Sequence, residues 1–169
     1  MTRSDSINQV LTFVASDERY GMNLDKIEEV LFMMSFQDLP NMPSFVAGVI
    51  NLRGDLVPVI DFSERLSKPR AKPDSPEDSV YPSTARMLLL AVQGQEFVLV
   101  VDQVERIHEV AKSDLHPIVS GANGAESFLS TMWLNDGVMI PLVEPEQLFS
   151  DSDWSKLPHS TQHGVRPNA

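Results

Sequence analysis

The stretch GVINLRGDLVPVID, Gly48 to Asp61, decides the fold, because an Arg-Gly-Asp turn joins two apolar runs of strand length within it. Residues 49–52 and 56–60 are aliphatic and β-branched, as strands usually are. The Gly54-Asp55 pair between them permits the positive φ of a tight hairpin. Because Pro58 cannot donate a ladder hydrogen bond, we expect the second strand to lie at a sheet edge or to point this nitrogen away from its neighbour. The stretch predicts a β-hairpin and contains no obvious catalyst.

Apolar runs of similar length recur on both sides of this hairpin and predict an all-β protein. Further strands are expected at residues 9–15, 20–24, 86–92, 96–101, 130–134 and 138–143. Turn signals separate several of these runs, notably Gln93-Gly94 and Asn135-Asp136-Gly137. Short helices are expected at residues 25–31, 44–47, 63–66 and 145–149. Many short strands with a few short helices are typical of a barrel or a sandwich.

Two segments of the first half are echoed in the second half. Residues 24–30 and 101–107 both follow the order apolar, Asp, polar, apolar, Glu, charged, apolar, at an offset of 77 residues. Residues 57–61 resemble 140–144 at an offset of 83 residues. The echoes predict two similarly built sheet units on either side of a Pro-rich stretch. Chance recurrence of short apolar and acidic patterns is the alternative.

Length and charge exclude several classes of protein. A chain of 169 residues fits one ordinary domain or two very small ones that share a core. The formal charge of −11 opposes binding to nucleic acid or to an anionic membrane surface. There is no Cys, the start of the chain has no apolar signal core, and the longest apolar runs are too short to span a bilayer. We therefore expect a cytoplasmic protein.

Three segments have a composition that opposes packing into a core. The stretch 67–85 holds four prolines together with Ser, Asp and Glu, and is predicted to be a surface loop. Residues 150–169 contain few apolar side chains, and residues 1–8 begin with a polar run. Both ends are therefore expected to be disordered.

The sequence offers little for catalysis. The four histidines show no H-x-x-x-H or H-E-x-x-H spacing, and neither a nucleophile elbow nor a phosphate-binding Gly-rich loop ending in Lys is present. We therefore expect no catalytic residues, no cofactor and no metal. Binding residues are more plentiful, because the apolar run from Ile27 to Met34 is too long for one short element to bury on one face. This run could fill the core, contact a partner, or do both.

The chain resembles the CheW family, the adaptor domains of bacterial chemosensory arrays. The family signature G-V-I-N-L-R-G followed by V-P-V-I-D matches Gly48 to Gly54 and Val57 to Asp61 residue for residue. The resemblance extends over about residues 9–149, although Val98 stands where the family usually has Gly. Further matching segments are Leu11-Thr12-Phe13, Tyr20-Gly21-Met22, Ile27-Glu28-Glu29-Val30, Leu39-Pro40, Met42-Pro43 and Val100 to Val104.

The resemblance implies one CheW-like domain of two five-stranded SH3-like β-barrels packed side by side, with or without a terminal strand that crosses between them. The first barrel would comprise about residues 9–66 and the second about residues 86–149. The resemblance also implies a non-enzymatic adaptor that couples chemoreceptors, through their cytoplasmic hairpin tips, to the regulatory domain of a CheA-type histidine kinase. Such adaptors are recruited to membrane-associated receptor arrays, where they contact other CheW-like proteins in rings, and they serve flagellar chemotaxis or a type IV pilus pathway.

In such proteins a receptor helix lies in an apolar groove between the two barrels. The resemblance therefore implies that ten residues of this chain form the floor and rim of such a groove. Arg53 and Glu29 are expected to form a bidentate ion pair, although turn chemistry alone could also explain Arg53 and Gly54. Two alternatives to an adaptor are a small-ligand sensor that uses the same groove as its pocket, and a cryptic hydrolase. The predicted floor of the groove is Ile27, Val30, Val49, Leu52 and Val57, with Gly48 and Gly54 for close backbone approach and Glu29, Asn51 and Arg53 on the rim.

Overall fold

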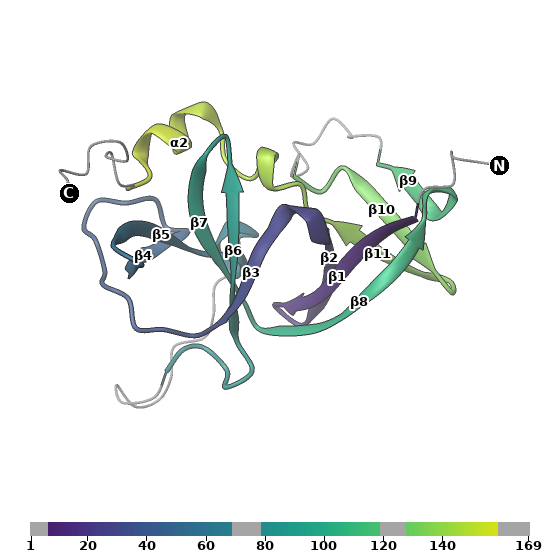
Figure 1. Cartoon of the computed structure of the whole chain (residues 1–169), viewed down its shortest axis with the longest axis horizontal. Helices are drawn as coiled ribbons and strands as arrows, with labels where there is room; N and C mark the ends of the chain where they lie inside the picture. The colour runs from purple at the N-terminus through teal and green to yellow at the C-terminus, as the bar shows by residue number, and fades with distance from the viewer. Residues whose placement is uncertain (1–6, 69–78, 119–127, 159–169) are drawn as a thin grey trace.

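The computed structural model describes residues 7–68, 79–118 and 128–158, and most of the described chain forms strands. The strands make two sheets that lie side by side (Figure 1). Sheet A has six strands in the order β8-β1-β2-β11-β10-β9, and sheet B has five in the order β3-β6-β7-β5-β4. The predicted all-β class with short helices is confirmed. The strands are β1 Ile7–Ala15, β2 Glu18–Asn23, β3 Ile27–Phe32, β4 Val46–Leu52, β5 Asp55–Asp61, β6 Arg86–Val92, β7 Gln95–Val101, β8 Gln103–Ala111, β9 Leu115–Pro117, β10 Thr131–Asn135 and β11 Val138–Leu142.

The sheets do not follow the expected division of the chain into residues 9–66 and 86–149. Strand β3, from the first half, pairs with β6, and strand β8, from the second half, pairs with β1. Sheet A therefore joins β1 and β2 to strands of the second half, and sheet B joins β6 and β7 to strands of the first half. The expectation left room for a terminal strand that crosses between the units, and β1 does lie in the sheet of β8–β11. The wider exchange was missed because each hairpin was assigned to the unit nearest to it along the chain.

Both sheets repeat one pattern of pairing, which explains the sequence echoes. In each sheet, two antiparallel hairpins meet through a parallel pair, and an edge strand from the other half completes the sheet. A bridge between Gln37 and Val49 stands in sheet B where β9 stands in sheet A. Corresponding pairs, sheet A first, are Phe13↔Tyr20 and Leu90↔Phe97, Val10↔His108 and Met87↔Leu31, Gly21↔Leu142 and Val98↔Val59, and Trp133↔Ile140 and Ile50↔Val57.

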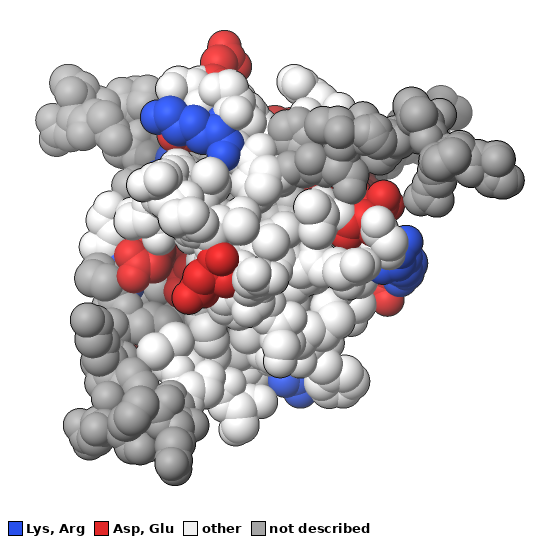
Figure 2. Space-filling model, turned by 90° about the vertical axis from the view of Figure 1, so that its left-hand side faces the viewer, with Lys and Arg blue, Asp and Glu red and all other residues white. Residues whose placement is uncertain are grey.

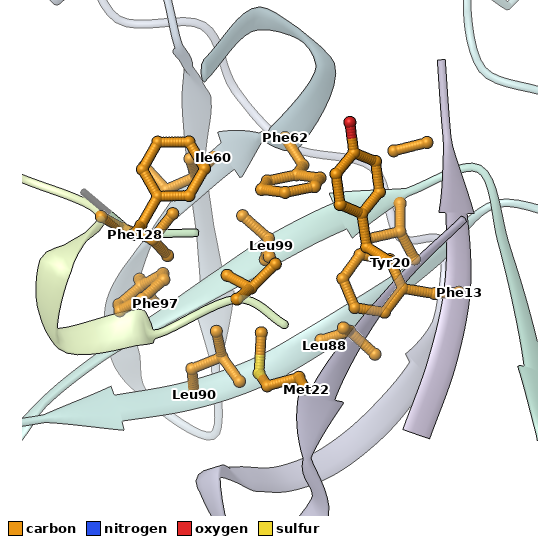
Figure 3. Packing of buried hydrophobic residues seen from close by; sticks show 14 of the residues in the cluster. Phe13, Tyr20, Met22, Ile60, Phe62, Leu88, Leu90, Phe97, Leu99 and Phe128 are labelled. Carbon is orange, nitrogen blue, oxygen red and sulfur yellow. The ribbon is translucent and has the colours of Figure 1, made fainter. Parts of the chain in front are cut away.

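Three hydrophobic clusters hold the fold together. The central core lies between the sheets, where aromatic and aliphatic side chains from both sheets point toward one another (Figure 3). A second cluster draws on all five strands of sheet B, and a third lies within sheet A. Each sheet thus curls around a small core of its own and shares the central one. Labelled members of the central core are Phe13, Tyr20, Met22, Ile60, Phe62, Leu88, Leu90, Phe97, Leu99 and Phe128.

Two of the four expected helices are wrong. Residues 24–26 form one 3-10 turn, but 27–32 are strand β3, and β4 already begins at Val46. Pairing with β6 along the whole of β3 outweighs the local helical pattern. The expected helix at 63–66 is present as α1, Phe62–Arg65, and a 3-10 helix, Pro145–Gln147, lies in the segment predicted at 145–149.

Strand β5 lies inside sheet B, between β4 and β7, so the expectation of an edge strand is wrong. The alternative expectation for Pro58 holds. Val49, opposite Pro58, exchanges its backbone hydrogen bonds with Gln37, so neither Val49 nor Pro58 directs its backbone nitrogen at the other. The nitrogen of Pro58 therefore points toward the β7 side, where pairing begins only at Val59.

The ends of the chain are more ordered than expected. Ile7 and Asn8 already pair with β8, and helix α2, Asp151–Lys156, follows Ser150, which caps it together with Asp153. Leu157 is buried in the central core, so the predicted disordered tail does not begin at Ser150. Residues 1–6, 69–78, 119–127 and 159–169 lie outside the described residues. Within the described chain, no helix has the length and hydrophobicity to span a membrane.

Candidate partner-binding surface

The β4–β5 hairpin turns on Arg53 and Gly54 rather than on the expected Gly54-Asp55 pair. Both residues have positive φ, 56° and 90°, as a two-residue hairpin turn requires. The side chain of Asn51 closes the turn by accepting a hydrogen bond of 2.9 Å from the Gly54 N–H. A Cβ on Gly54 would meet nothing within 4 Å, so this glycine supplies backbone freedom and not the expected close approach.

Gly48 does permit a close approach, but the approaching segment belongs to this chain. A Cβ at Gly48 would lie 2.3 Å from the carbonyl oxygen of Gln37 and 2.9 Å from the ring of Phe36. The gap lets Gln37 and Val49 exchange two backbone hydrogen bonds of 2.8 and 2.9 Å. Gly48 therefore lies under the segment that follows β3 and is not available to a partner.

Arg53 and Glu29 form the predicted ion pair, but through one hydrogen bond and not the expected bidentate contact. Nη2 of Arg53 lies 2.6 Å from Oε1 of Glu29, and the hydrogen bond to Glu29 raises the pKa of Arg53 above its ordinary value. The Arg53 side chain is 66% exposed, so solvent screens the ion pair and it adds little to stability. Its consequence is geometric, because it joins edge strand β3 to the hairpin of the opposite edge strand, β4, and so helps to close sheet B.

The rim around this ion pair carries an excess of negative charge. Glu28, Glu29, Asp55 and Glu96 surround the single guanidinium of Arg53. Burial raises the pKa of Glu96, and so do the charge of Glu28, a hydrogen bond with Glu28 and the charge of Asp55. A partner with basic groups would find a complementary surface here.

The five residues predicted to form the floor do not share one surface. Val57 is only 1% exposed and Val49 9% exposed, and Val57 belongs to the sheet B core. Leu52 packs against that same core, whereas Ile27 packs against the central core. Val30 alone among the five is exposed, at 43%.

Val30 is one of four apolar residues, on the two edge strands β3 and β8, that we together name the edge strip: Ile27, Val30 and Phe32 on β3, and Ile107 on β8. Val30 pairs with Leu88 and Ile107 pairs with Leu11, and both partners lie in the central core. The strip therefore borders the junction between the sheets. Sequence reasoning missed Ile107, although the echo aligns it with Val30.

A second group of exposed apolar residues lies at the ends of the hairpins, and we name it the hairpin patch. It comprises Leu134, Val138 and Met139 on β10–β11, with Leu56 in the corresponding hairpin of sheet B. The β4–β5 end of the molecule presents mostly uncharged side chains, with acidic and basic groups in a few separate places (Figure 2). Both surfaces favour binding over chemistry, and the residues that the structure describes contain no group of three or more His, Cys, Asp or Glu that could hold a metal.

Comparisons with known proteins agree with this picture. The model of the CheW-like domain matches residues 9–153. A chemotaxis protein CheW from Rhizobium meliloti is 30% identical over 148 residues, which is 86% of this chain and 89% of that relative. Protein FrzA from Myxococcus xanthus is 30% identical over 118 residues, which is 69% of this chain and 68% of that relative.

A solved structure supports the same assignment. The crystal structure of the scaffolding protein TtCheW from Thermoanaerobacter tengcongensis superimposes with a TM-score of 0.74 at 25% identity, over 88% of this chain and 96% of that one. Because the family model covers most of the chain, membership does not rest on a local motif. The chain belongs to the CheW-like domain family, whose members are scaffolds and adaptors and not enzymes.

Proposed function

We propose that this protein is the coupling adaptor of a chemosensory array. It would join the regulatory domain of a CheA-type histidine kinase to the cytoplasmic hairpin tips of chemoreceptors, in the cytoplasm beneath the membrane that holds them. Family membership over residues 9–153 supports the proposal, as do relatives named chemotaxis protein CheW. Two settings stay open for this proposal, flagellar chemotaxis and a type IV pilus pathway, because one relative carries a name other than chemotaxis protein CheW.

The edge strip is the proposed receptor contact, and its exposed apolar side chains are the observation that carries the proposal. Val30 is 43% exposed, Phe32 74% and Ile107 51%, beside a core that both sheets share. An amphipathic receptor helix needs an apolar surface with polar neighbours. The acidic rim supplies those neighbours on the sheet B side.

The hairpin patch is the proposed contact for the kinase domain and for further CheW-like proteins in rings. Met139 is 58% exposed and Leu56 50%, and they occupy corresponding places in the two sheets. Exposed apolar residues at corresponding places of both sheets, three on β10–β11 and Leu56 on β4–β5, suit a component that must contact a neighbour on each side. Exposed apolar residues in such groups mark interaction surfaces more often than isolated ones do.

Affinity co-purification with a chemoreceptor and its kinase tests both contacts. Val30→Asp with Ile107→Asp is expected to lose the receptor and retain the kinase, and Leu134→Asp with Met139→Asp the reverse. Val80→Asp is the matched control, because Val80 is an exposed apolar residue outside both surfaces. Circular dichroism confirms that each variant folds. Normal recovery of both partners by both folded double variants would refute the assigned contacts.

A charge exchange tests whether Arg53 touches a partner or only holds the hairpin. Arg53→Glu alone places two carboxylates in contact with each other, whereas Arg53→Glu with Glu29→Arg restores an ion pair at the same place. If Arg53 acts by closing sheet B, the double variant recovers normal binding and Arg53→Glu does not. If both variants fail equally, Arg53 contacts the partner directly.

A further inference from the structure

Sheet A contains a cavity that the adaptor function does not require. Its volume is about 460 Å³, which lies within the range of small-molecule sites. Its lining comes from β1, β2, β8 and the β10–β11 hairpin, and includes Ile140, a member of the sheet A core. Polar side chains dominate its walls. The polar and charged residues of the lining include Thr12, Arg19, Glu105, Arg106, His108 and Asn135.

Sheet B shows what the fold itself needs at these positions. In the repeated pairing pattern, three polar residues of the cavity correspond to leucines that are buried in, or packed against, the sheet B core. Leucine at these positions fills the mouth of sheet B, so the fold does not demand polar groups there. The corresponding pairs, sheet A first, are Thr12 and Leu89, His108 and Leu31, and Asn135 and Leu52.

The polar groups of the cavity hold one another in place. The hydroxyl of Thr12, which is 1% exposed, lies 3.2 Å from Nε2 of His108 and 3.3 Å from the carbonyl oxygen of Arg106. The ring of His108 packs edge-on against Trp133, with 5.0 Å between centroids. Two contacts thus fix the imidazole at the cavity wall, as a binding site requires.

The charge at the cavity is positive although the protein is strongly acidic. Two guanidiniums, Arg19 and Arg106, oppose one carboxylate, Glu105. Arg19 forms an ion pair with Glu105 through hydrogen bonds of 2.6 and 3.0 Å, which neutralises its charge. Within the described part of the chain, the guanidinium of Arg106 has no hydrogen-bond partner, so it is available to a ligand. The corresponding place in sheet B is Glu29, which is acidic.

We propose that this cavity binds a small organic anion with a terminal carboxylate or phosphate. Arg106 would contact the anionic oxygens, and His108 and Asn135 offer hydrogen bonds to the rest of the ligand, while the buried Thr12 orients His108. The proposal goes beyond the adaptor function and does not depend on it. A ligand here would lie behind β8, the strand that carries Ile107 of the edge strip.

Nuclear magnetic resonance titration with two probes, inorganic phosphate and succinate, tests the proposal on the full chain. We expect saturable shifts of the cavity residues with at least one probe, and the probe that saturates first distinguishes a phosphate from a carboxylate site. Arg106→Gln is expected to weaken binding at least about tenfold. Arg53→Gln is the matched control, because it removes the same charge from the rim of sheet B and should leave the affinity unchanged.

A filled cavity provides an independent check. Thr12→Leu with His108→Leu introduces the residues that sheet B uses at the same places, so the variant is expected to fold and to lose the saturable shifts. If it fails to fold, the Arg106→Gln titration still decides. The proposal is overturned if neither probe saturates in the wild type, or if the shifts are the same in wild type and Arg106→Gln. Neither result bears on the co-purification of kinase and receptor.

Discussion

Gly21 and Val98 stand at corresponding positions of the two sheets, but only Val98 has room for a side chain. A Cβ on Gly21 would lie 2.8 Å from side-chain atoms of both Leu142 and Val10. In sheet A, the side chains of Leu142 and Val10 therefore occupy the space that a side chain at position 21 would need. In sheet B, the side chain of Val98 is itself part of the core. At Gly48 the obstacle is backbone, which cannot move aside as a side chain can.

The difference between a backbone obstacle at Gly48 and a side-chain obstacle at Gly21 predicts which alanine substitution destabilises the protein more. Gly48→Ala is expected to lower the free energy of unfolding by about 2–3 kcal/mol, because the new methyl group must separate Gln37 from Val49 and break their two hydrogen bonds. Gly21→Ala is expected to cost less, since the tips of Leu142 and Val10 can shift. Urea denaturation followed by tryptophan fluorescence measures both. A larger loss for Gly21→Ala would show that the bridge to Gln37 yields more easily than the core does.

Glu96 predicts a pH dependence. Its pKa is raised above the ordinary value of 4.5, mainly by burial and then by Glu28, so the folded state binds more protons than the unfolded state in the window just above 4.5. The stability that Glu96 contributes is therefore greatest below that window and is lost as pH rises through the folded-state pKa. Glu96→Gln should raise the urea midpoint at about pH 7 and not at about pH 4. Glu109→Gln, an exposed control, should change neither; a Glu96→Gln gain that is equal at both pH values would contradict the charge explanation.

The sequence predicted one contact of the proposed binding surface and misjudged the exposure of another residue. The ion pair of Glu29 and Arg53 was predicted correctly, because the two side chains have opposite charge and stand at motif positions that lie near each other in the CheW family. Val57 was assigned to the floor because residues 56–60 are apolar without a break, and such a run does not reveal which face is buried. The structure buries Val57 and exposes Leu56.

At the scale of elements, the strands that cross between the sheets were the hardest to predict. Strand β8 carries Glu105, Arg106, His108 and Glu109 among its nine residues, and β3 carries two adjacent glutamates. Edge strands have one side open to solvent and tolerate such charges. The charges obscure the alternation of apolar and polar residues by which a strand is recognised in a sequence. The hairpin strands were predicted well, because Gly-containing turns mark the ends of β4–β5, β6–β7 and β10–β11, although β1–β2 turns on Ser16 and Asp17.

Helix α2 was missed because its sequence has no apolar stripe. It is identified only by a capping box and by two apolar residues, Trp154 and Leu157, that contact the central core. Leu157→Ala is expected to cost about 2–4 kcal/mol, since Leu157 is 4% exposed in the central core. Ser150→Ala should cost about 1 kcal/mol through loss of the cap. Ser155→Ala, on the exposed side of the helix, is the control. Denaturant unfolding measures all three, and a Leu157→Ala variant as stable as Ser155→Ala would show that the helix does not support the core.

At the scale of the whole molecule, the exchange of β3 and β8 makes the two halves of the chain interdependent. Each sheet takes strands from both sides of the Pro-rich stretch, and the central core takes side chains from both sheets. A sequence can reveal that two units are alike, as the echoes did. It does not reveal which copy completes which sheet, because β3 and β8 carry similar patterns and could each pair at either place.

The exchange predicts that neither half of the chain folds alone. A fragment ending at Pro73 would hold β1–β5 without β6 and β7, which separate β3 from β5 in sheet B, and a fragment starting at Asp74 would hold β6–β11 without β1 and β2, which separate β8 from β11 in sheet A. Each would expose one face of the central core. We expect each fragment by itself to show no cooperative thermal transition, and the equimolar mixture to regain the circular dichroism spectrum and a single transition of the intact protein. If either fragment alone unfolds cooperatively as a monomer, a half-chain can close a sheet with its own strands, and the pairing of β3 with β6 and of β8 with β1 would not be what unites the molecule.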